Sequence, residues 1–463
     1  MNTSPYAPLT PDTANAPLPP LAAGRPLLGH AVEMYRESIL HMRDLYYRYG
    51  PIYRVRVPGR EYTILAGRDA NLMLSGTGDA YFTSRGQFSD FGAEMGTEHF
   101  MIELDGEEHN QLRRMERPGY SKQALIPHLN EVIAITRRHI ASWPLGGRIS
   151  VLDAMQRLVT EQIGTAILGH PPGDYFDDLR IFMVTVLRAL VVGSWPRVML
   201  KRPAYRRAKR RIFQLARDVT ETYRHMPAEE RPSRNLVAEL LKYREAGHPL
   251  MDEDTLIASV VGAYLAGLDT VAGTLSFAIY AWLKHGVWGQ VASAAADLFS
   301  EGVPSMSALR KADVLHAAVM EVLRMYPVAA FTPRLAAQSF TFYGYRVEKG
   351  TRLLIANTLT HFLPEFFPKP DTFDLERHLP PRKEYRQAGV FAPFTLGPHT
   401  CLGAGMAEVQ LMTTLATIVH GAELALDPPD YRVRQALTPI PSPGFDFKVR
   451  LVRRETILPA PVG

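Results

Sequence analysis

The stretch Phe394-Thr-Leu-Gly397-Pro-His399-Thr-Cys401-Leu-Gly403 contains the only cysteine of this 463-residue chain. A lone cysteine is most often a small buried hydrophobic residue, but the neighbours of this one favour a different role. Gly397 permits a tight turn, and Gly403 allows the helix predicted to follow to begin close to another group. Cys401 stands at the N-terminus of that helix, where amide donors and the helix dipole favour a thiolate. Cys401 is therefore a candidate metal ligand or nucleophile.

The spacing of these residues resembles the haem-binding signature of the cytochrome P450 family, F-x-x-G-x-[basic]-x-C-x-G, at every fixed position. The resemblance implies that the Cys401 thiolate is the axial iron ligand of haem b. It also implies that Phe394 packs beside the thiolate and that His399 donates to a haem propionate. A cysteine nucleophile with His399 as its base is the alternative, but the glycine-framed loop fits haem better.

A second element lies in the apolar segment 254–284, as Ala266-Gly267-Leu268-Asp269-Thr270. The segment is long enough to cross a membrane, but its central Asp269 and the lack of a comparable second span favour a helix buried in a soluble protein. A bent or capped helix with an incidental acid is one interpretation of this element. It also resembles the family's [AG]-G-x-[DE]-T element. That resemblance implies that Ala266 and Gly267 leave room for dioxygen and that Asp269 and Thr270 relay protons.

The Glu-x-x-Arg tetrads of the chain include Glu321-Val-Leu-Arg324 and Glu221-Thr-Tyr-Arg224. Only the first follows the threonine segment and precedes Phe373-Asp-Leu-Glu376-Arg377, which resembles the family's P-E-R-F segment with Leu375 and His378 as replacements. Spacing by three residues places the acid and the base on one helix face, where a second arginine can complete a buried ion-pair network. We therefore expect a structural network of Glu321, Arg324 and Arg377.

The carboxylates of a haem require cations. The segment Glu107-Glu-His109-Asn-Gln-Leu-Arg113 resembles the family's third helix, where a His or Trp and an Arg four residues later bind the propionates. Arg334, in Phe331-Thr-Pro-Arg334, occupies the position of a further propionate-binding arginine. The resemblance thus implies a cationic clamp of His109, Arg113 and Arg334, with charge-assisted hydrogen bonds.

The rest of the chain is mostly helical in pattern, with short alternating segments near both ends. Helical spacing covers 33–49, most of 107–325 and 402–420, whereas 52–57, 61–65, 340–347, 352–355 and 445–452 read as strands. The expected fold class is mostly α with small β-sheets. The resemblance implies the cytochrome P450 fold, with haem between a long distal helix and the cysteine loop. Residues 1–25 are expected to be a Pro-rich flexible leader and residues 26–463 a single catalytic domain.

Four segments that form the substrate pocket in this family are apolar here, which predicts a lipophilic substrate such as a terpenoid, steroid, fatty acyl or polyketide-like molecule. The candidate lining residues are Phe88, Phe91, Met95, Phe100, Met101, Ala263, Ala266, Val328, Ala329, Phe331, Leu437 and Ile440.

A net charge of +5, with dispersed basic residues, argues against nucleic-acid binding. The basic segment 201–211 is either a solvated helix face or a contact for an anionic partner or membrane surface. The N-terminal residues lack the pattern of a signal peptide, so we expect a cytoplasmic protein without a transmembrane anchor.

The expected activity is that of a haem-thiolate monooxygenase that uses O2. The chain contains no flavin or nicotinamide module, so electrons are expected from an external ferredoxin and its reductase, for which Arg113, Arg114 and Lys122 offer basic contacts. A peroxide-driven or isomerising haem-thiolate enzyme is one alternative. A haem-binding sensor or carrier without turnover is another.

Overall fold

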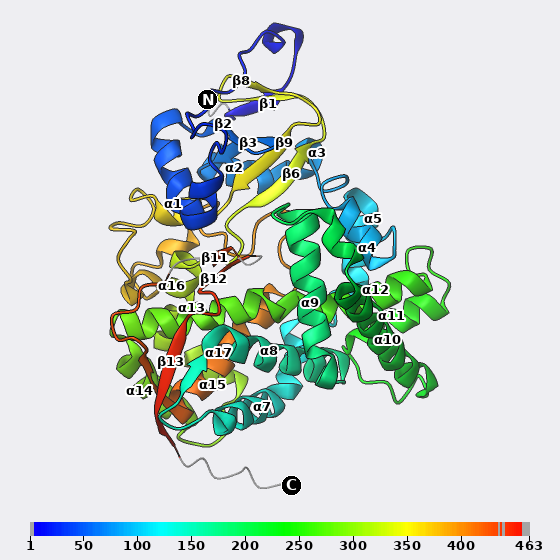
Figure 1. Ribbon diagram of the computed structural model, residues 1–463, viewed down its shortest axis with the longest axis vertical. Coiled ribbons are helices and arrows are strands. Elements are labelled where there is room, and N and C mark those ends of the chain that lie inside the picture. Colours follow the sequence, from blue (N-terminus) through cyan, green and yellow to red (C-terminus); the bar gives the residue numbers. More distant parts are fainter. Residues whose placement is uncertain (1–3, 434–435, 438–439, 456–463) are drawn as a thin grey trace. The chain divides into compact units, whose positions relative to one another are not determined.

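The computed structural model describes residues 4–433, 436–437 and 440–455, and its contacts divide the chain into two compact units (Figure 1). Unit 1 contains Met1–Arg113, Pro327–Phe373 and Arg382–Cys401. Unit 2 contains Arg114–Tyr326, Asp374–Pro381 and Leu402–Gly463. The candidate cysteine is thus the last residue of a unit 1 segment.

Unit 1 is built on a five-stranded sheet of order β2-β3-β9-β6-β4. Its strands are β2 (Ile52–Val57), β3 (Arg60–Ala66), β4 (Phe82–Thr83), β6 (Thr332–Ala336) and β9 (Arg352–Ala356). Strands β2 and β3 pair antiparallel and confirm the strands predicted at 52–57 and 61–65, and Gly59 supplies the positive φ of +73° that the turn between them requires. Strand β9 then pairs parallel with β3, which brings the segment after residue 327 beside the N-terminal hairpin.

A second, three-stranded sheet in unit 1 has the order β1-β7-β8. It contains β1 (Tyr6–Pro8), β7 (Phe340–Phe342) and β8 (Tyr345–Val347). Strand β1 lies within the expected leader and pairs antiparallel with β7. The flexibility of the leader stays a prediction.

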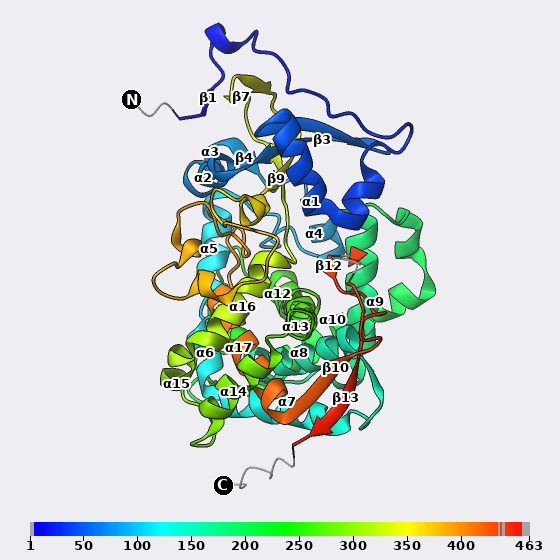
Figure 2. The same cartoon turned by 90° about the vertical axis from the view of Figure 1, so that its left-hand side faces the viewer.

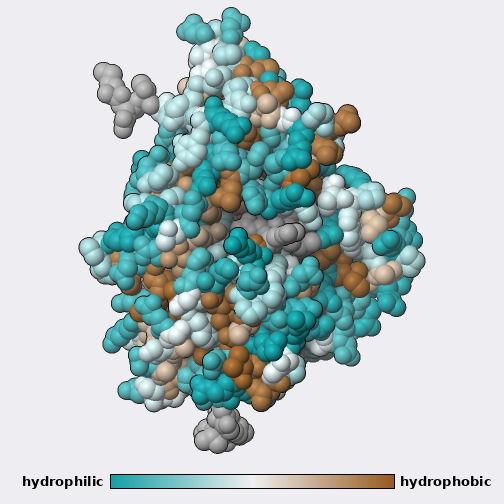
Figure 3. All heavy atoms as spheres, turned by 60° about the vertical axis from the view of Figure 1, so that its left-hand side comes forward, coloured by the Kyte–Doolittle hydropathy of each residue, from teal (hydrophilic) through white to brown (hydrophobic). Residues whose placement is uncertain are grey.

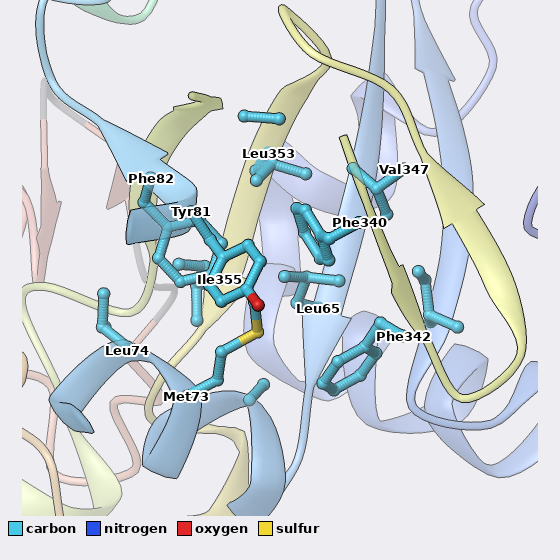
Figure 4. Close-up of a cluster of buried hydrophobic side chains, with 13 residues drawn as sticks. Leu65, Met73, Leu74, Tyr81, Phe82, Phe340, Phe342, Val347, Leu353 and Ile355 are labelled. Carbon is cyan, nitrogen blue, oxygen red and sulfur yellow. The ribbon is translucent and has the colours of Figure 1, made fainter. Parts of the chain in front are cut away.

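The core of unit 1 forms where these sheets meet short helices. Its helices are α1 (Ala31–Tyr49), α2 (Arg68–Gly76), α3 (Gly78–Tyr81), α4 (Ser89–Met95) and the unit 1 part of α5 (Gly106–Glu116). Figure 4 shows Leu65 and Ile355 of the large sheet, Phe340 of the small sheet and Met73 of α2 gathered in one cluster, each fully buried. Burial of these side chains fixes α2 against the sheet, and the end of α2 later meets the cysteine loop.

Unit 2 is mainly helical. Its helices are α6 (Lys122–Leu125), α7 (Leu129–Ser142), α8 (Val151–Leu168), α9 (Phe176–Val186), α10 (Pro203–His225), α11 (Leu236–Glu245), α12 (Glu253–Leu268), α13 (Thr270–Lys284), α14 (Trp288–Phe299), α15 (Met306–Lys311), α16 (Asp313–Met325) and α17 (Ala404–Gly421). Figure 2 shows α12 and α13 in the middle of this group, and both pack against α8.

Small sheets and short turns complete the chain. In unit 2, β10 (Ala422–Leu426), β13 (Lys448–Arg454) and β5 (Arg148–Ser150) form one sheet, and β11 (Ala436–Leu437) pairs with β12 (Pro441–Ser442). Short 3-10 or π turns are η1 (Pro11–Thr13), η2 (Ile126–His128), η3 (Gly173–Tyr175), η4 (Leu187–Val191), η5 (Arg197–Lys201), η6 (Leu359–Phe362), η7 (Leu375–His378) and η8 (Glu384–Arg386). The chain is therefore mostly helical with small sheets, as predicted.

The long apolar segment predicted as one helix is interrupted at Asp269, which separates α12 from α13. Within the described residues, Glu253–Lys284 is the one stretch long and apolar enough to cross a membrane, with a mean hydropathy of 1.6 in its most apolar window. That window is 83% buried, the condition of a core helix in a soluble protein. The face in Figure 3 is covered mainly by hydrophilic side chains, with apolar ones between them.

Candidate functional site

The cysteine loop is a tight structure within unit 1. The backbone N–H of Cys401 donates to the carbonyl of Phe394 at 3.0 Å, and the N–H of Thr400 donates to the carbonyl of Gly397 at 3.0 Å. Gly397 has a φ of +77°, and a Cβ there would lie 2.2 Å from the carbonyl oxygen of Leu74 at the end of α2. Backbone conformation and space therefore both demand glycine at 397. Cys401 itself is exposed.

The second glycine of the loop has a different environment. A Cβ at Gly403 would meet only the side chains of Met406 and Tyr120, both at an ordinary contact distance of 3.8 Å. Packing within the protein thus does not require glycine there, although α17 begins at the next residue. The absence of a side chain at 403 fits a bulky group bound beside the cysteine.

Three of the predicted cofactor-binding residues lie together in unit 1. The ring of His109, on α5, stacks on the ring of His399, with centroids 4.0 Å apart and planes at 25°. Arg113, one turn along α5, donates to the carbonyl oxygen of Thr400 next to the cysteine. The helix and the loop therefore place two imidazoles and a guanidinium at one site, and their role in cofactor binding stays a prediction.

Asp105 belongs to the same group and was missed by the sequence analysis. Its Oδ1 lies 3.2 Å from Nε2 of His399. Burial raises the pKa of this carboxyl group, but hydrogen bonds from His399, Thr83 and two backbone N–H groups outweigh burial and hold the pKa far below its usual range. The available signal was its position directly before α5, where aspartate commonly accepts from backbone amides.

Burial controls the charge of the two histidines. It lowers the pKa of His109 to about 3, and the charges of His399 and Arg113 lower it further. The pKa of His399 is also lowered, mainly by burial, even though the hydrogen bond with Asp105 opposes this. At neutral pH, both rings are therefore neutral unless an anion binds beside them.

The surroundings of Arg334 give the strongest indication that an anionic cofactor fits this site. It lies on β6, is 6% exposed, and lines the same small cavity as His399 and Leu74. Its guanidinium donates to the carbonyl of Pro333 at 2.8 Å, and no carboxylate in the described part of the chain forms an ion pair with it. Burial lowers its pKa to about 10. A buried arginine without an ion pair is costly unless a bound anion compensates it, and a haem propionate is such an anion.

The candidate proton-relay residues lie in unit 2, at the junction of α12 and α13. Asp269 is 3% exposed, and Nε2 of Gln156 donates to its Oδ1 at 2.7 Å. Burial raises the pKa of Asp269 to about 6, although the Gln156 hydrogen bond lowers it. The Thr270 hydroxyl donates to the carbonyl of Ala266 at 2.7 Å. The carboxyl group can thus exchange a proton near neutral pH.

The two small residues of this element have different surroundings. Ala266 is exposed and is bonded through its carbonyl to Thr270. Gly267 is buried, and a Cβ there would lie 2.2 Å from Cδ1 of Ile163 and 3.2 Å from Cγ1 of Val159, both on α8. Glycine at 267 therefore lets α12 approach α8 closely. Its predicted place beside dioxygen stays a prediction.

All residues of the Glu321 network lie in unit 2. Arg324 donates to both carboxylate oxygens of Glu321 at 2.8 Å, and Nε of Arg377 lies 3.4 Å from Oε1. Nε2 of His378 lies 2.9 Å from Oε2. Burial raises the pKa of Glu321, but Arg324 and His378 lower it below its usual value. The replacement of the family's Phe by His378 thus adds a partner that sequence analysis missed.

The candidate substrate residues are dispersed over several elements. Phe88, Phe91 and Met95 are buried at or in α4, and the Phe91 and Phe100 rings meet edge to face at 5.2 Å. Among the others, Met101, Val328 and Ile440 are half-buried, Ala329 is exposed and Ala263 is buried in α12. Phe331 is partly buried and packs against the cluster of buried residues that includes Ile39 and Met42 of α1. Leu437 lies in β11, and its side chain is outside the described residues. Their substrate role stays a prediction.

Comparison with known proteins identifies the family. The family model for cytochrome P450 matches residues 19–444. The chain belongs to the cytochrome P450 family. Cytochrome P450 139 of Mycobacterium tuberculosis is 28% identical over 423 residues, which cover 88% of this chain and 96% of the relative. Cyclooctat-9-en-7-ol 5-monooxygenase of Streptomyces melanosporofaciens is 27% identical over 430 residues, which cover 89% and 92% of the two chains.

A solved structure shows the same P450 fold. Cyanobacterial CYP120A1, determined with retinoic acid bound, superposes with a TM-score of 0.80 at 19% identity, over 94% of this chain and 99% of that one. This P450 is therefore an oxidoreductase of the monooxygenase type, and its family implies a haem held by a cysteine thiolate. Cys401, Arg334 and the His109–His399 stack are the residues whose chemistry fits that group.

Proposed function

We propose that this P450 inserts one oxygen atom from O2 into a lipophilic small molecule, by hydroxylation or epoxidation, in the cytoplasm. The observation that carries the proposal is the cysteine loop, in which Cys401 is exposed at the end of a turn that only glycine at 397 permits. Bound haem supplies oxygen activation at its iron. Every other step depends on how the chain's own side chains hold the cofactor, the proton and the substrate.

We assign cofactor binding to the cysteine and to basic side chains of unit 1. We propose that the Cys401 thiolate would bind the haem iron and that Arg334, Arg113, His109 and His399 would hold its carboxylates. A propionate beside the imidazoles favours their charged forms, so cofactor binding is expected to take up protons at this site. Asp105 fixes the orientation of His399 through Nε2.

Proton delivery is assigned to Asp269 and Thr270. A carboxyl group with a pKa of about 6 is populated in both forms near neutral pH, as a relay requires. The Thr270 hydroxyl donates to the Ala266 carbonyl, which leaves the lone pairs of its oxygen able to accept a proton from a neighbouring donor.

The substrate is proposed to be lipophilic because the residues expected to contact it are apolar, led by Phe88, Phe91 and Met95. The relative from Streptomyces is named for the oxidation of cyclooctat-9-en-7-ol, an alkenol, which is compatible with this class. Electrons are proposed to come from a ferredoxin and its reductase. Arg114 and Lys122 are exposed and are retained as candidate contacts, whereas Arg113 is engaged with Thr400.

The proposal is tested first by the absorption spectrum of the reduced protein with carbon monoxide. Wild-type protein is expected to give the Soret shift of a thiolate haem, and Cys401→Ser is expected to lose it. A wild-type spectrum without that shift contradicts the assignment of Cys401.

Turnover separates the remaining alternatives. With a surrogate ferredoxin, its reductase and a panel of lipophilic compounds, Thr270→Ala is expected to divert electrons from product to peroxide. Unchanged coupling in Thr270→Ala contradicts the relay. Full activity with hydrogen peroxide alone favours the peroxide-driven enzyme, and binding without turnover of any compound favours the sensor or carrier.

A further inference from the structure

The contact between Gln156 and Asp269 is a feature of unit 2 that no sequence motif accounts for. The two residues are 113 positions apart and are joined by one hydrogen bond of 2.7 Å, from Nε2 to Oδ1. Their side chains are 2% and 3% exposed. Figure 2 shows α8, which carries Gln156, beside α12 and α13. The interior of the helical unit thus contains an amide and a carboxyl group that are almost completely shielded from solvent.

Each partner also has one buried oxygen without a hydrogen-bond donor among the described residues, Oε1 of Gln156 and Oδ2 of Asp269. Two unpaired acceptors are costly in the interior, and a full carboxylate charge adds to that cost. A proton on Oδ2 removes both problems, because it neutralises the charge and converts Oδ2 into a donor. A carboxylic acid and a primary amide have complementary groups: one N–H for Oδ1 and one carbonyl for the acid hydrogen.

We propose that Gln156 is a positioning residue that holds the transferable proton of Asp269 on Oδ2. The N–H group of Gln156 occupies Oδ1, and its carbonyl accepts the acid hydrogen. When Asp269 gives up the proton in the proposed relay, the Oδ2–H bond breaks and an O–H bond forms on the Thr270 oxygen. The carboxylate keeps its hydrogen bond at Oδ1, and one proton taken up from solvent restores the acid. The inference rests on the proposed function, in which Asp269 delivers protons, and Gln156 acts through Asp269.

Charged groups on the packed elements do not account for the state of Asp269. Its pKa responds to burial first and to Gln156 second. Many charged side chains of the neighbouring helices form ion pairs with one another or with nearby residues. On α8 and α9 they are Asp153, Arg157, Glu161, Asp177, Asp178 and Arg180; on α10, α11 and α16 they are Arg211, Glu221, Arg224, Glu239, Lys242, Glu245, Glu321 and Arg324.

The test uses the infrared carbonyl band of protonated Asp269 in the haem-loaded protein, identified by its loss in Asp269→Asn. Gln156→Met removes the donor to Oδ1 with little change in volume. The variant also removes the carbonyl that accepts the acid hydrogen, but the N–H bond to the carboxylate is charge-assisted and stronger than that neutral bond. The midpoint at which the band disappears is therefore expected to rise by about one pH unit. The pH above which coupling falls is expected to move in the same direction.

Gln162→Met is the matched control. Gln162 lies on the same helix and is fully buried, but its amide donates to Thr136 and Thr414 instead of Asp269. The control is expected to leave the Asp269 midpoint unchanged. An unchanged midpoint in Gln156→Met, or an equal shift in both variants, overturns the proposal.

Gln156→Glu gives a second test that keeps the shape of the side chain. Two carboxyl groups then share the site, and the titration is expected to split into two steps, the later one at higher pH than in wild type. A single step at the wild-type midpoint overturns the proposal.

The proposed function and this inference can fail separately. If Asp269→Asn leaves coupling intact while Gln156→Met still shifts the infrared midpoint, the proton relay of the proposed function is contradicted, whereas the pairing of Gln156 with Asp269 is supported.

Discussion

The two Glu-x-x-Arg tetrads of unit 2 have the same spacing and opposite environments. Glu321 and Arg324, on α16, are fully buried and share two hydrogen bonds of 2.8 Å. Glu221 and Arg224, on α10, also form an ion pair, but their side chains are 46% and 37% exposed. The local pattern produces the same pair in both places, so the sequence spacing alone does not create the buried network.

The difference lies in what the rest of the chain adds. Glu321 also accepts from the backbone N–H of Asp374 at 3.0 Å and has Arg377 and His378 beside it. Arg224 gains an exposed partner at the start of α12, Glu253, at 2.9 Å. Burial of a charge is tolerated where several partners surround it, and the segment around η7 supplies them at residue 321.

Among the variants that test this comparison, Arg324→Ala is expected to have the largest effect on stability. Arg324→Ala leaves the Glu321 charge buried with fewer partners, and the free energy of unfolding is expected to fall by about 3–5 kcal/mol. Urea unfolding followed by circular dichroism measures the effect. Arg324→Lys, which keeps the charge but loses the two-pronged hydrogen bonding, is expected to fall between Arg324→Ala and wild type. A wild-type midpoint for Arg324→Ala contradicts the importance of the buried pair.

A medium effect is expected from His378→Phe, which restores the residue found in the family's P-E-R-F segment. It removes the contact with Oε2 of Glu321 and is expected to cost about 1–3 kcal/mol. Hydrogen bonding by His378 helps to lower the pKa of Glu321. Stability from a lowered carboxyl pKa is present above the unfolded pKa and is lost as pH falls through the folded one. Acid unfolding of His378→Phe is therefore expected at a higher pH than in wild type; a midpoint at the same or lower pH shows that His378 only fills space.

The smallest effect is expected at the exposed tetrad. Arg224→Ala is expected to change the free energy of unfolding by at most about 1 kcal/mol, since exposed ion pairs contribute little and are screened by salt. The same urea titration, repeated at high salt, checks this. A loss as large as that of Arg324→Ala would show that exposure does not separate the two tetrads.

Residues that lie close together could be predicted where a motif is continuous in the chain, although their roles stay predictions. The cysteine loop, the pair of His109 and Arg113 on α5, and the Glu321–Arg324 pair depend on short spacings, which helices and turns convert into geometry. Asp105, Gln156 and His378 were not predicted, because their partners lie on other segments. Gln156, for example, is one buried glutamine of two on α8, and only the packing of α8 against α12 distinguishes it from Gln162.

The interruption between α12 and α13 was one of the interpretations that the sequence left open. The segment is apolar on both sides of Asp269, and periodicity alone does not show where one helix ends and the next begins. Gly267 was assigned to the cofactor from its place in a motif, and this role stays a prediction. Its missing side chain also permits the close contact with Ile163 of α8, which no motif predicted.

Cys401 is the only cysteine of the chain and is exposed. Its reactivity can therefore report what fraction of the protein holds the cofactor. A thiol reagent reacts with one thiol per chain, and the sulfur of that thiol is the proposed iron ligand. Titration of the native protein therefore counts molecules whose ligand is not engaged, and titration after denaturation counts all molecules. The first count divided by the second is the unloaded fraction, and the remainder is the loaded fraction, measured without reference to colour or turnover.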